Sequence, residues 1–159
     1  MKAAIIFGSQ SDTPIMKKAA AVLREFGVDF SSHVLSAHRT PELLTETLKK
    51  LESEEVEVII AGAGLAAHLP GVIASQTLIP VIGVPIASGG LGGLDALLSI
   101  AQMPKPIPAA AVGVDNAANG AYLACQILAL KYPVLREKLT AFRNRMKTDF
   151  AGENQAPDL

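Results

Sequence analysis

Residues 1–27, MKAAIIFGSQSDTPIMKKAAAVLREFG, contain a short apolar run followed by an amphipathic segment. The run from Lys2 to Phe7 predicts a buried strand that ends at Gly8. The next segment predicts a helix that stops at Gly27, because apolar side chains recur on one helical face: Ile15, Ala19, Val22, Leu23 and Phe26. A strand, a turn and a helix in this order form the repeating unit of parallel α/β domains.

The same unit recurs four more times along the chain. Strands are expected at residues 28–35, 56–60, 80–85 and 107–114, and helices at 40–53, 68–75, 94–102 and 116–130. The apolar strands suit a sheet that is buried on both faces. We therefore expect residues 1–150 to form one α/β domain, a doubly wound three-layer α/β/α sandwich. Its five-stranded parallel sheet is expected to have the flavodoxin-like order 2-1-3-4-5.

A sixth helix is expected after Tyr132-Pro133, although no strand remains for it to cover. Its apolar stripe consists of Leu135, Leu139, Phe142, Met146 and Phe150. Such a stripe is normally buried, and we expect it to pack on a neighbouring subunit, with packing on its own domain as the alternative. Residues 151–159 are expected to form a flexible tail.

Composition excludes several classes of protein. Half of the 159 residues are hydrophobic and 18% are charged, which excludes intrinsic disorder. The net charge of −1 gives no basic surplus for nucleic acid or an anionic membrane. The uncharged segment 58–94 is interrupted by Pro70, Pro80 and Pro85 and is interpreted as buried structure rather than a membrane span. The N-terminal apolar run is too short for a signal peptide, so we expect a cytoplasmic protein.

Polar residues are concentrated in the loops that follow the first three strands, where parallel sheets bind ligands. The first loop holds Ser9, Ser11 and Asp12 just before a helix N-terminus, a position that favours an anion such as phosphate. The serine hydroxyls are suited to donate to the anion, and Asp12 to accept from ribose hydroxyls. Capping of the helix by Ser11 or Asp12 explains the same residues equally well.

The second and third loops add an arginine and two histidines. Arg39 offers a planar fork for phosphate, with the Ser36 hydroxyl nearby. His38 is a candidate proton carrier, because an imidazole gains and loses a proton near neutral pH. In the third loop small residues, including Gly64, leave an apolar space beside His68, which is either a participant or a packed residue. The four glycines within residues 89–93 of the fourth loop indicate a mobile flap or a tight turn.

Three loops together resemble the signature loops of the N5-carboxyaminoimidazole ribonucleotide mutases of purine biosynthesis. The motifs are Gly8-Ser-Gln-Ser-Asp12, Ser36-Ala-His-Arg-Thr-Pro41 and Ala61-Gly-Ala-Gly-Leu-Ala-Ala-His-Leu-Pro-Gly71, and the similarity extends over residues 3–130. The resemblance implies a flavodoxin-like domain, a homo-octamer and no cofactor or metal. It also implies an activity, the shift of a carboxylate from N5 to C4 of the aminoimidazole ring.

Carried onto this sequence, the resemblance assigns nucleotide binding to Ser9, Asp12 and Arg39, with Ser11 and Ser36 beside them. It assigns proton transfer to His38, and we expect His68 to take part in catalysis. The remaining residues expected to contact the substrate come from the same loops: Gly8, Ala37, Gly64, Ala67 and Leu69. The chain departs from the family pattern at Gly92-Gly93, Ala96 and Lys105-Pro106.

Three alternative functions stay open. A related branch carboxylates aminoimidazole ribonucleotide directly with CO2, but typically has Lys where Arg39 stands. A carboxylase or decarboxylase acting on another nucleotide is suggested by the altered fourth loop. A non-catalytic flavodoxin-like protein is the third, either a flavin carrier or a phosphorelay receiver. The loops lack aromatic residues to stack a flavin, and Ala61-Gly62 stands where a receiver needs an aspartate.

Overall fold

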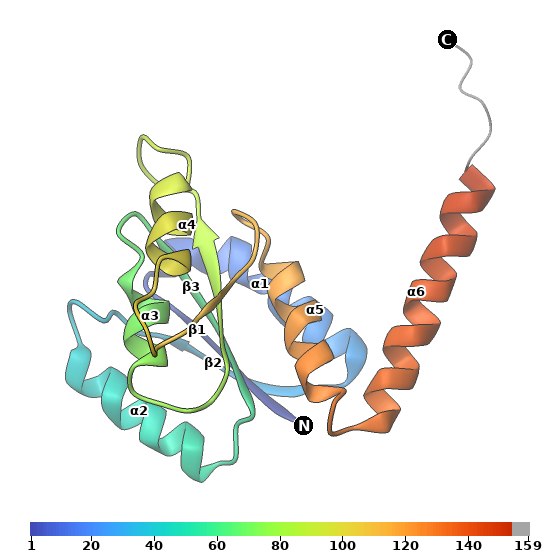
Figure 1. Cartoon of the computed structure of the whole chain (residues 1–159), viewed down its shortest axis with the longest axis horizontal. Coiled ribbons are helices and arrows are strands. Elements are labelled where there is room, and N and C mark those ends of the chain that lie inside the picture. The colour runs from blue at the N-terminus through green and yellow to red at the C-terminus, as the bar shows by residue number, and fades with distance from the viewer. Residues whose placement is uncertain (154–159) are drawn as a thin grey trace.

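The computed structural model describes residues 1–153 and contains five strands. They are β1 (Lys2–Phe7), β2 (Asp29–Val34), β3 (Val58–Gly64), β4 (Val81–Ile86) and β5 (Ala110–Ala111). The helices are the short 3-10 turn η1 (Gln10–Asp12), α1 (Thr13–Phe26), α2 (Pro41–Ser53), α3 (His68–Ala74), α4 (Leu94–Ala101), α5 (Ala117–Leu128) and α6 (Pro133–Glu153). All strand pairs are parallel, in the order β2-β1-β3-β4-β5. Figure 1 shows the whole chain, with helices packed around the sheet. The predicted fold class and strand order are confirmed.

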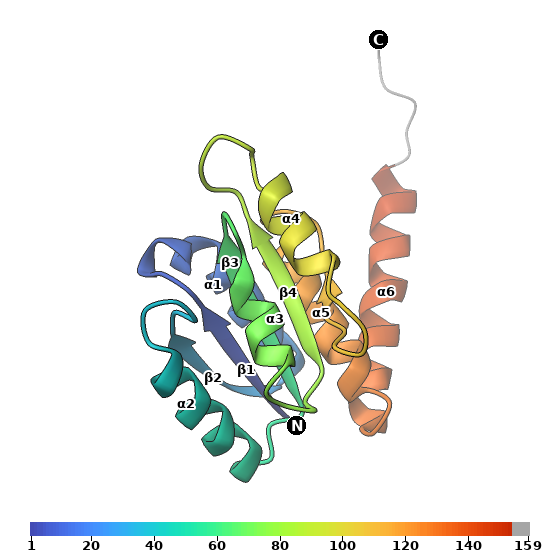
Figure 2. The same cartoon turned by 60° about the vertical axis from the view of Figure 1, so that its left-hand side comes forward.

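The sheet separates two hydrophobic cores, as the apolar strands predicted. Helices α1 and α5 cover one face, and α2, α3 and α4 cover the other (Figure 2). Alternate residues of β1 point to opposite sides: Ile5 belongs to the α1/α5 core and Ile6 to the α2/α3/α4 core, and both are fully buried. A strand at this position needs apolar residues on both faces.

The prediction of a strand at 107–114 is wrong in its length. Only Ala110–Ala111 pair with β4, at Ile82 and Gly83. Pro104, Pro106 and Pro108 lie in and before the predicted range. Proline cannot donate to a strand ladder, so β5 is a short, exposed edge strand.

Helix α6 divides into a packed part and an exposed part. Leu135 is fully buried, and Leu139 and Phe142 pack against the α1/α5 core. Met146 and Phe150, further along the predicted stripe, are 56% and 75% exposed where the helix leaves the body of the molecule (Figure 1). Packing on a neighbouring subunit therefore stays a prediction for the second part. Residues 151–153 of the expected tail are helical, and 154–159 lie outside the described residues.

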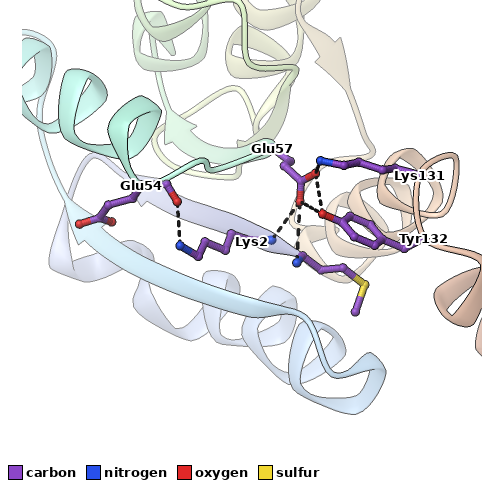
Figure 3. A network of polar contacts seen from close by, with 6 residues as sticks. Lys2, Glu54, Glu57, Lys131 and Tyr132 are labelled. Carbon is purple, nitrogen blue, oxygen red and sulfur yellow. Dashed lines mark hydrogen bonds and ion pairs between the residues drawn. The ribbon is translucent and has the colours of Figure 1, made fainter.

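Glu57 connects three segments at the amino-terminal edge of the sheet (Figure 3). Its carboxylate accepts hydrogen bonds from Lys131 Nζ at 2.7 Å and Tyr132 Oη at 3.0 Å, and lies 3.8 Å from the Met1 amine. Burial opposes ionisation of this carboxylate, but the bonds from Lys131, Tyr132 and the Lys2 amide outweigh it and lower the Glu57 pKa. The junction of α5 and α6 is thereby fixed to β1 and β3.

No helix within residues 1–153 is both long and apolar enough to span a membrane.

Candidate active site

A cavity of about 400 Å³ opens at the carboxyl edge of the sheet. It is lined by the loops after β1, β2 and β3, together with Ser88 after β4. The strand order reverses between β1 and β3, so the loops after these strands turn to opposite faces and leave a crevice between them. The lining residues are Gly8, Ser9, Ser11, Asp12, Ser36, Ala37, His38, Arg39, Ala63, Gly64, Leu65, Ala66, His68, Leu69 and Ser88.

The first loop forms a compact cluster of oxygen atoms. Ser9 Oγ accepts from the Ser11 hydroxyl at 2.8 Å and from the Ser11 amide at 3.3 Å, where it caps η1. Asp12 is 9% exposed, and among the residues whose burial is described it is the only buried charged side chain. Burial raises the Asp12 pKa, partly offset by the Ser11 hydroxyl and the Ser9 backbone. A ligand hydroxyl that donates to this carboxylate would stabilise its charged form.

Arg39 joins the second loop to the first. Its Nη2 donates to the Gly8 carbonyl at 2.8 Å, and its own amide donates to Ser36 Oγ at 3.2 Å. A guanidinium has five N–H donors, so this bond leaves others available to a ligand in the cavity, which Arg39 lines. A positive charge therefore stands beside the serine hydroxyls, an arrangement suited to an anionic group.

The two candidate catalytic histidines contact each other. His38 Nε2 lies 2.7 Å from His68 Nδ1, and the rings meet edge to face with centroids 4.9 Å apart. His38 comes from the turn after β2, whereas His68 is the first residue of α3. One ring must donate and the other accept, so the tautomer of each ring depends on the other. Chemically, such a pair can exchange a proton with a ligand, and the contact restrains the orientation of both rings.

Small residues form the third side of the cavity. Ala63, Gly64 and Ala66 expose little apart from backbone and methyl groups. A Cβ on Gly64 would collide with Ser88 Oγ and lie 3.0 Å from the Ile86 carbonyl oxygen, so a larger residue would require both neighbours to move. The wall is uncharged, as predicted for the apolar space beside His68.

All the site residues predicted from the sequence line this cavity except Ala67. Ala67 is 1% exposed and packs in the α2/α3/α4 core, because it immediately precedes α3 and faces inward. The structure adds four lining residues that were not predicted: Ala63, Leu65, Ala66 and Ser88. Their position in the sequence could have indicated them. Three lie within the third loop motif, residues 61–71, and Ser88 follows β4, the next strand of the sheet.

Other reactive groups lie elsewhere. His33 Nε2 contacts Ser31 Oγ at 2.9 Å within β2. Cys125 is buried in α5, and burial raises its thiol pKa to about 11, as expected of a core cysteine. Residues 1–153 contain no group of three or more His, Cys, Asp or Glu side chains placed to hold a metal ion.

Comparison with known proteins identifies the family. The model of the AIR carboxylase family matches residues 2–149. The N5-carboxyaminoimidazole ribonucleotide mutase of Pyrococcus abyssi is 60% identical, over 92% of this chain and 84% of its own. The enzyme of that name from Vibrio parahaemolyticus is 49% identical, over 99% of this chain and 100% of its own. The crystal structure of Treponema denticola PurE superposes with a TM-score of 0.89 at 26% identity, over 96% of both chains. The chain belongs to the AIR carboxylase family, and the resemblance of its loops to the mutases is confirmed.

Proposed function

We propose that this chain is an N5-carboxyaminoimidazole ribonucleotide mutase, an isomerase of purine biosynthesis. Relatives of that name match nearly its whole length. The observation that carries the proposal is the His38–His68 contact of 2.7 Å, located in a cavity that also gathers Ser9, Asp12 and Arg39. The reaction needs a proton carrier next to groups that bind a ribonucleotide, and these residues suit both roles, which supports the proposal.

In the proposed complex the first two loops hold the ribose phosphate. The Arg39 guanidinium and the hydroxyls of Ser9 and Ser11 donate to the phosphate oxygens. The ionised Asp12 carboxylate accepts from ribose hydroxyls, which offsets the cost of its burial. Ser36, which already accepts from the Arg39 amide, keeps the second loop in place. These contacts direct the aminoimidazole ring towards the histidines.

The chemistry requires one bond to break, one to form and one proton to move. The bond between N5 and its carboxylate carbon breaks, CO2 departs, and the electron pair stays on N5, which takes a proton from His38. Carbon C4 then attacks CO2, and the C4 proton returns to His38. No net proton is consumed, so a single imidazole serves both steps. His68 positions His38 through the bond between the two rings.

The uncharged wall of Ala63, Gly64 and Ala66 is suited to keep CO2 unhydrated between these steps. CO2 confined beside C4 recombines in an effectively unimolecular step. Loss of CO2 to water would instead release aminoimidazole ribonucleotide, a by-product that is measurable.

We further propose that the chain assembles as a homo-octamer. The exposed Met146 and Phe150 of α6 support an assembly, because solvent-facing apolar residues of this size are normally covered. Light scattering tests this, with a mass of eight times the 16.6 kDa chain expected and a monomeric mass contradicting it. A cytoplasmic location and the absence of a cofactor stay predictions.

Activity is tested by supplying freshly prepared N5-carboxyaminoimidazole ribonucleotide without ATP or metal. Rapid formation of the C4 carboxylate is expected. Aminoimidazole ribonucleotide with bicarbonate is supplied in parallel, because the family's description as AIR carboxylase makes direct carboxylation the second candidate. Efficient turnover of the second mixture at modest bicarbonate would favour that candidate, and no turnover of either would refute both.

A further inference from the structure

Leu65 has an unusual conformation at the rim of the cavity. Its φ is +54°, in the left-handed region that a residue with a Cβ rarely occupies, and its side chain is 54% exposed. It follows Gly64, at the end of β3, and lines the cavity. An exposed leucine in an unfavourable backbone conformation adds little to the stability of the fold. Its contacts with the rest of the site therefore need an explanation.

The Leu65 side chain rests on the loop of residues 87–93, which we call the glycine loop. A Cβ added to Gly89 would lie 2.7 Å from Leu65 Cδ2, so the leucine lies directly against this glycine. Gly89 itself has a φ of +74°. The preceding residue, Ser88, lines the cavity opposite Gly64. Leu65 therefore contacts the loop next to the residue that this loop contributes to the cavity.

The two ends of the glycine loop are held in different ways. At its start the Ala87 amide donates to Asp115 Oδ1 at 2.9 Å. At its end Gly93 is buried, with no room for a Cβ against Val114. Between them Gly90 has no neighbouring atom within 4 Å of an added Cβ, and Leu91 is 65% exposed. The contact between Leu65 and Gly89 lies between these two anchored ends.

We propose that Leu65 is a positioning residue that holds the glycine loop against the cavity and so retains CO2 during the reaction. This inference rests on the proposed mutase function. Leu65 does not touch the reacting atoms. It acts through Gly89, which keeps Ser88 in the wall, and its apolar side chain keeps water away from that side. When the loop moves outward, CO2 leaves before C4 can capture it, and the products are aminoimidazole ribonucleotide and CO2.

The test uses substitutions that accept the left-handed backbone. Leu65→Gly and Leu65→Asn both tolerate positive φ and lack the branched apolar end, so neither strains the chain. Leu65→Met keeps an apolar side chain of similar volume and serves as the rescue variant. Glu55→Gly is the matched control, because Glu55 also has positive φ, at +59°, and lies outside the cavity. Each full-length protein is compared with wild type in thermal unfolding and light scattering.

The decisive readout is the partition of N5-carboxyaminoimidazole ribonucleotide between the C4 carboxylate and aminoimidazole ribonucleotide, corrected for loss without enzyme. In Leu65→Gly and Leu65→Asn the fraction released as aminoimidazole ribonucleotide is expected to rise about tenfold. Losing the apolar contact of this partly exposed leucine shifts an open–closed equilibrium of the glycine loop by roughly that factor. Leu65→Met and Glu55→Gly are expected to match wild type. Amide exchange in the glycine loop is expected to speed up in the first two variants alone.

Several outcomes would overturn the proposal. An unchanged partition in Leu65→Gly, with wild type active, removes Leu65 from CO2 retention and leaves the mutase function intact. A changed assembly mass would make Leu65 a subunit contact instead. Wild type that does not convert the substrate refutes the proposed function. In that case unchanged amide exchange would also refute the positioning of the loop, since that measurement needs no turnover.

Discussion

Substitution of Gly64 by alanine should damage the site from within the fold. The added Cβ would collide with Ser88 Oγ and lie 3.0 Å from the Ile86 carbonyl oxygen. The serine can rotate away, but the carbonyl belongs to β4, which pairs with β3 in this register. Either β3 and β4 separate locally or the glycine loop is displaced. Overpacking of this kind costs about 1–3 kcal/mol.

The assay is thermal unfolding of three glycine variants in parallel, followed by kinetics. Gly64→Ala is expected to lower Tm by several degrees, since about 1 kcal/mol corresponds to roughly 2–4 °C in a chain of this size. Gly90→Ala is the stability control, because its Cβ meets no atom within 4 Å and its φ is not positive. It is expected to leave Tm unchanged.

Gly8→Ala separates stability from binding. Gly8 also has open space around its Cβ position, but it lines the cavity beside the Arg39 guanidinium. Its Tm is expected to match wild type, while KM for the nucleotide rises about tenfold as the methyl group occupies ligand space. Gly64→Ala with unchanged Tm and unchanged activity would refute the argument that this wall has no spare room.

Three further substitutions or treatments test other parts of the molecule. His38→Asn is expected to lower kcat by about 10²-fold or more with little change in nucleotide binding by calorimetry, and near-normal turnover would exclude His38 as the proton carrier. Glu57→Gln is expected to cost about 1–3 kcal/mol in urea unfolding at neutral pH, because it breaks a partly buried network. The folded-state pKa of Glu57 lies below its ordinary value of 4.5, so its contribution to the free energy of unfolding is present above pH 4.5. That contribution is lost as pH falls through the folded-state pKa, and the stabilities of wild type and Glu57→Gln should therefore converge in acid. Cys125, with a thiol pKa of about 11, should react with a thiol reagent at pH 8 only after unfolding.

The sequence predicted the layers and the strand order because each strand and helix carries its own local signal. The run from Lys2 to Phe7 is apolar, and Gly27, with φ +72°, ends α1 as expected. The length of the fifth strand was overestimated because hydrophobicity takes no account of the backbone N–H donors that proline lacks. The helix α6 was predicted correctly, but only the first three residues of its stripe pack on the α1/α5 core, because periodicity does not say what covers a helix face. The Phe142 ring packs on Phe26 and Tyr122 of its own chain, with distances between ring centroids of 5.6 Å and 5.4 Å.

The candidate site was predictable as a set of loops, because parallel strands place their carboxyl ends at one edge. The contacts between these loops could not be predicted from the sequence. The left-handed Leu65 and its contact with Gly89 depend on how the ends of β3 and β4 lie together, which no local pattern encodes. Ala67 illustrates the same point, since adjacency to His68 does not place its side chain on the cavity wall. A helix start turns successive side chains to different sides.

The position of the site in the sheet separates the loop proposed to bind the nucleotide from the histidines proposed to transfer the proton. The first loop leads into α1 on one face, whereas the second and third lead into α2 and α3 on the other. The oxygen cluster around Asp12 is therefore anchored to one core and the His38–His68 pair to the other. The bond from Arg39 to the Gly8 carbonyl crosses between them, and a phosphate held by Arg39 and Ser9 would span the same gap. In the proposed complex, a nucleotide that bridges the two sets of loops would therefore fix the distance between its ring and His38, the proposed proton carrier.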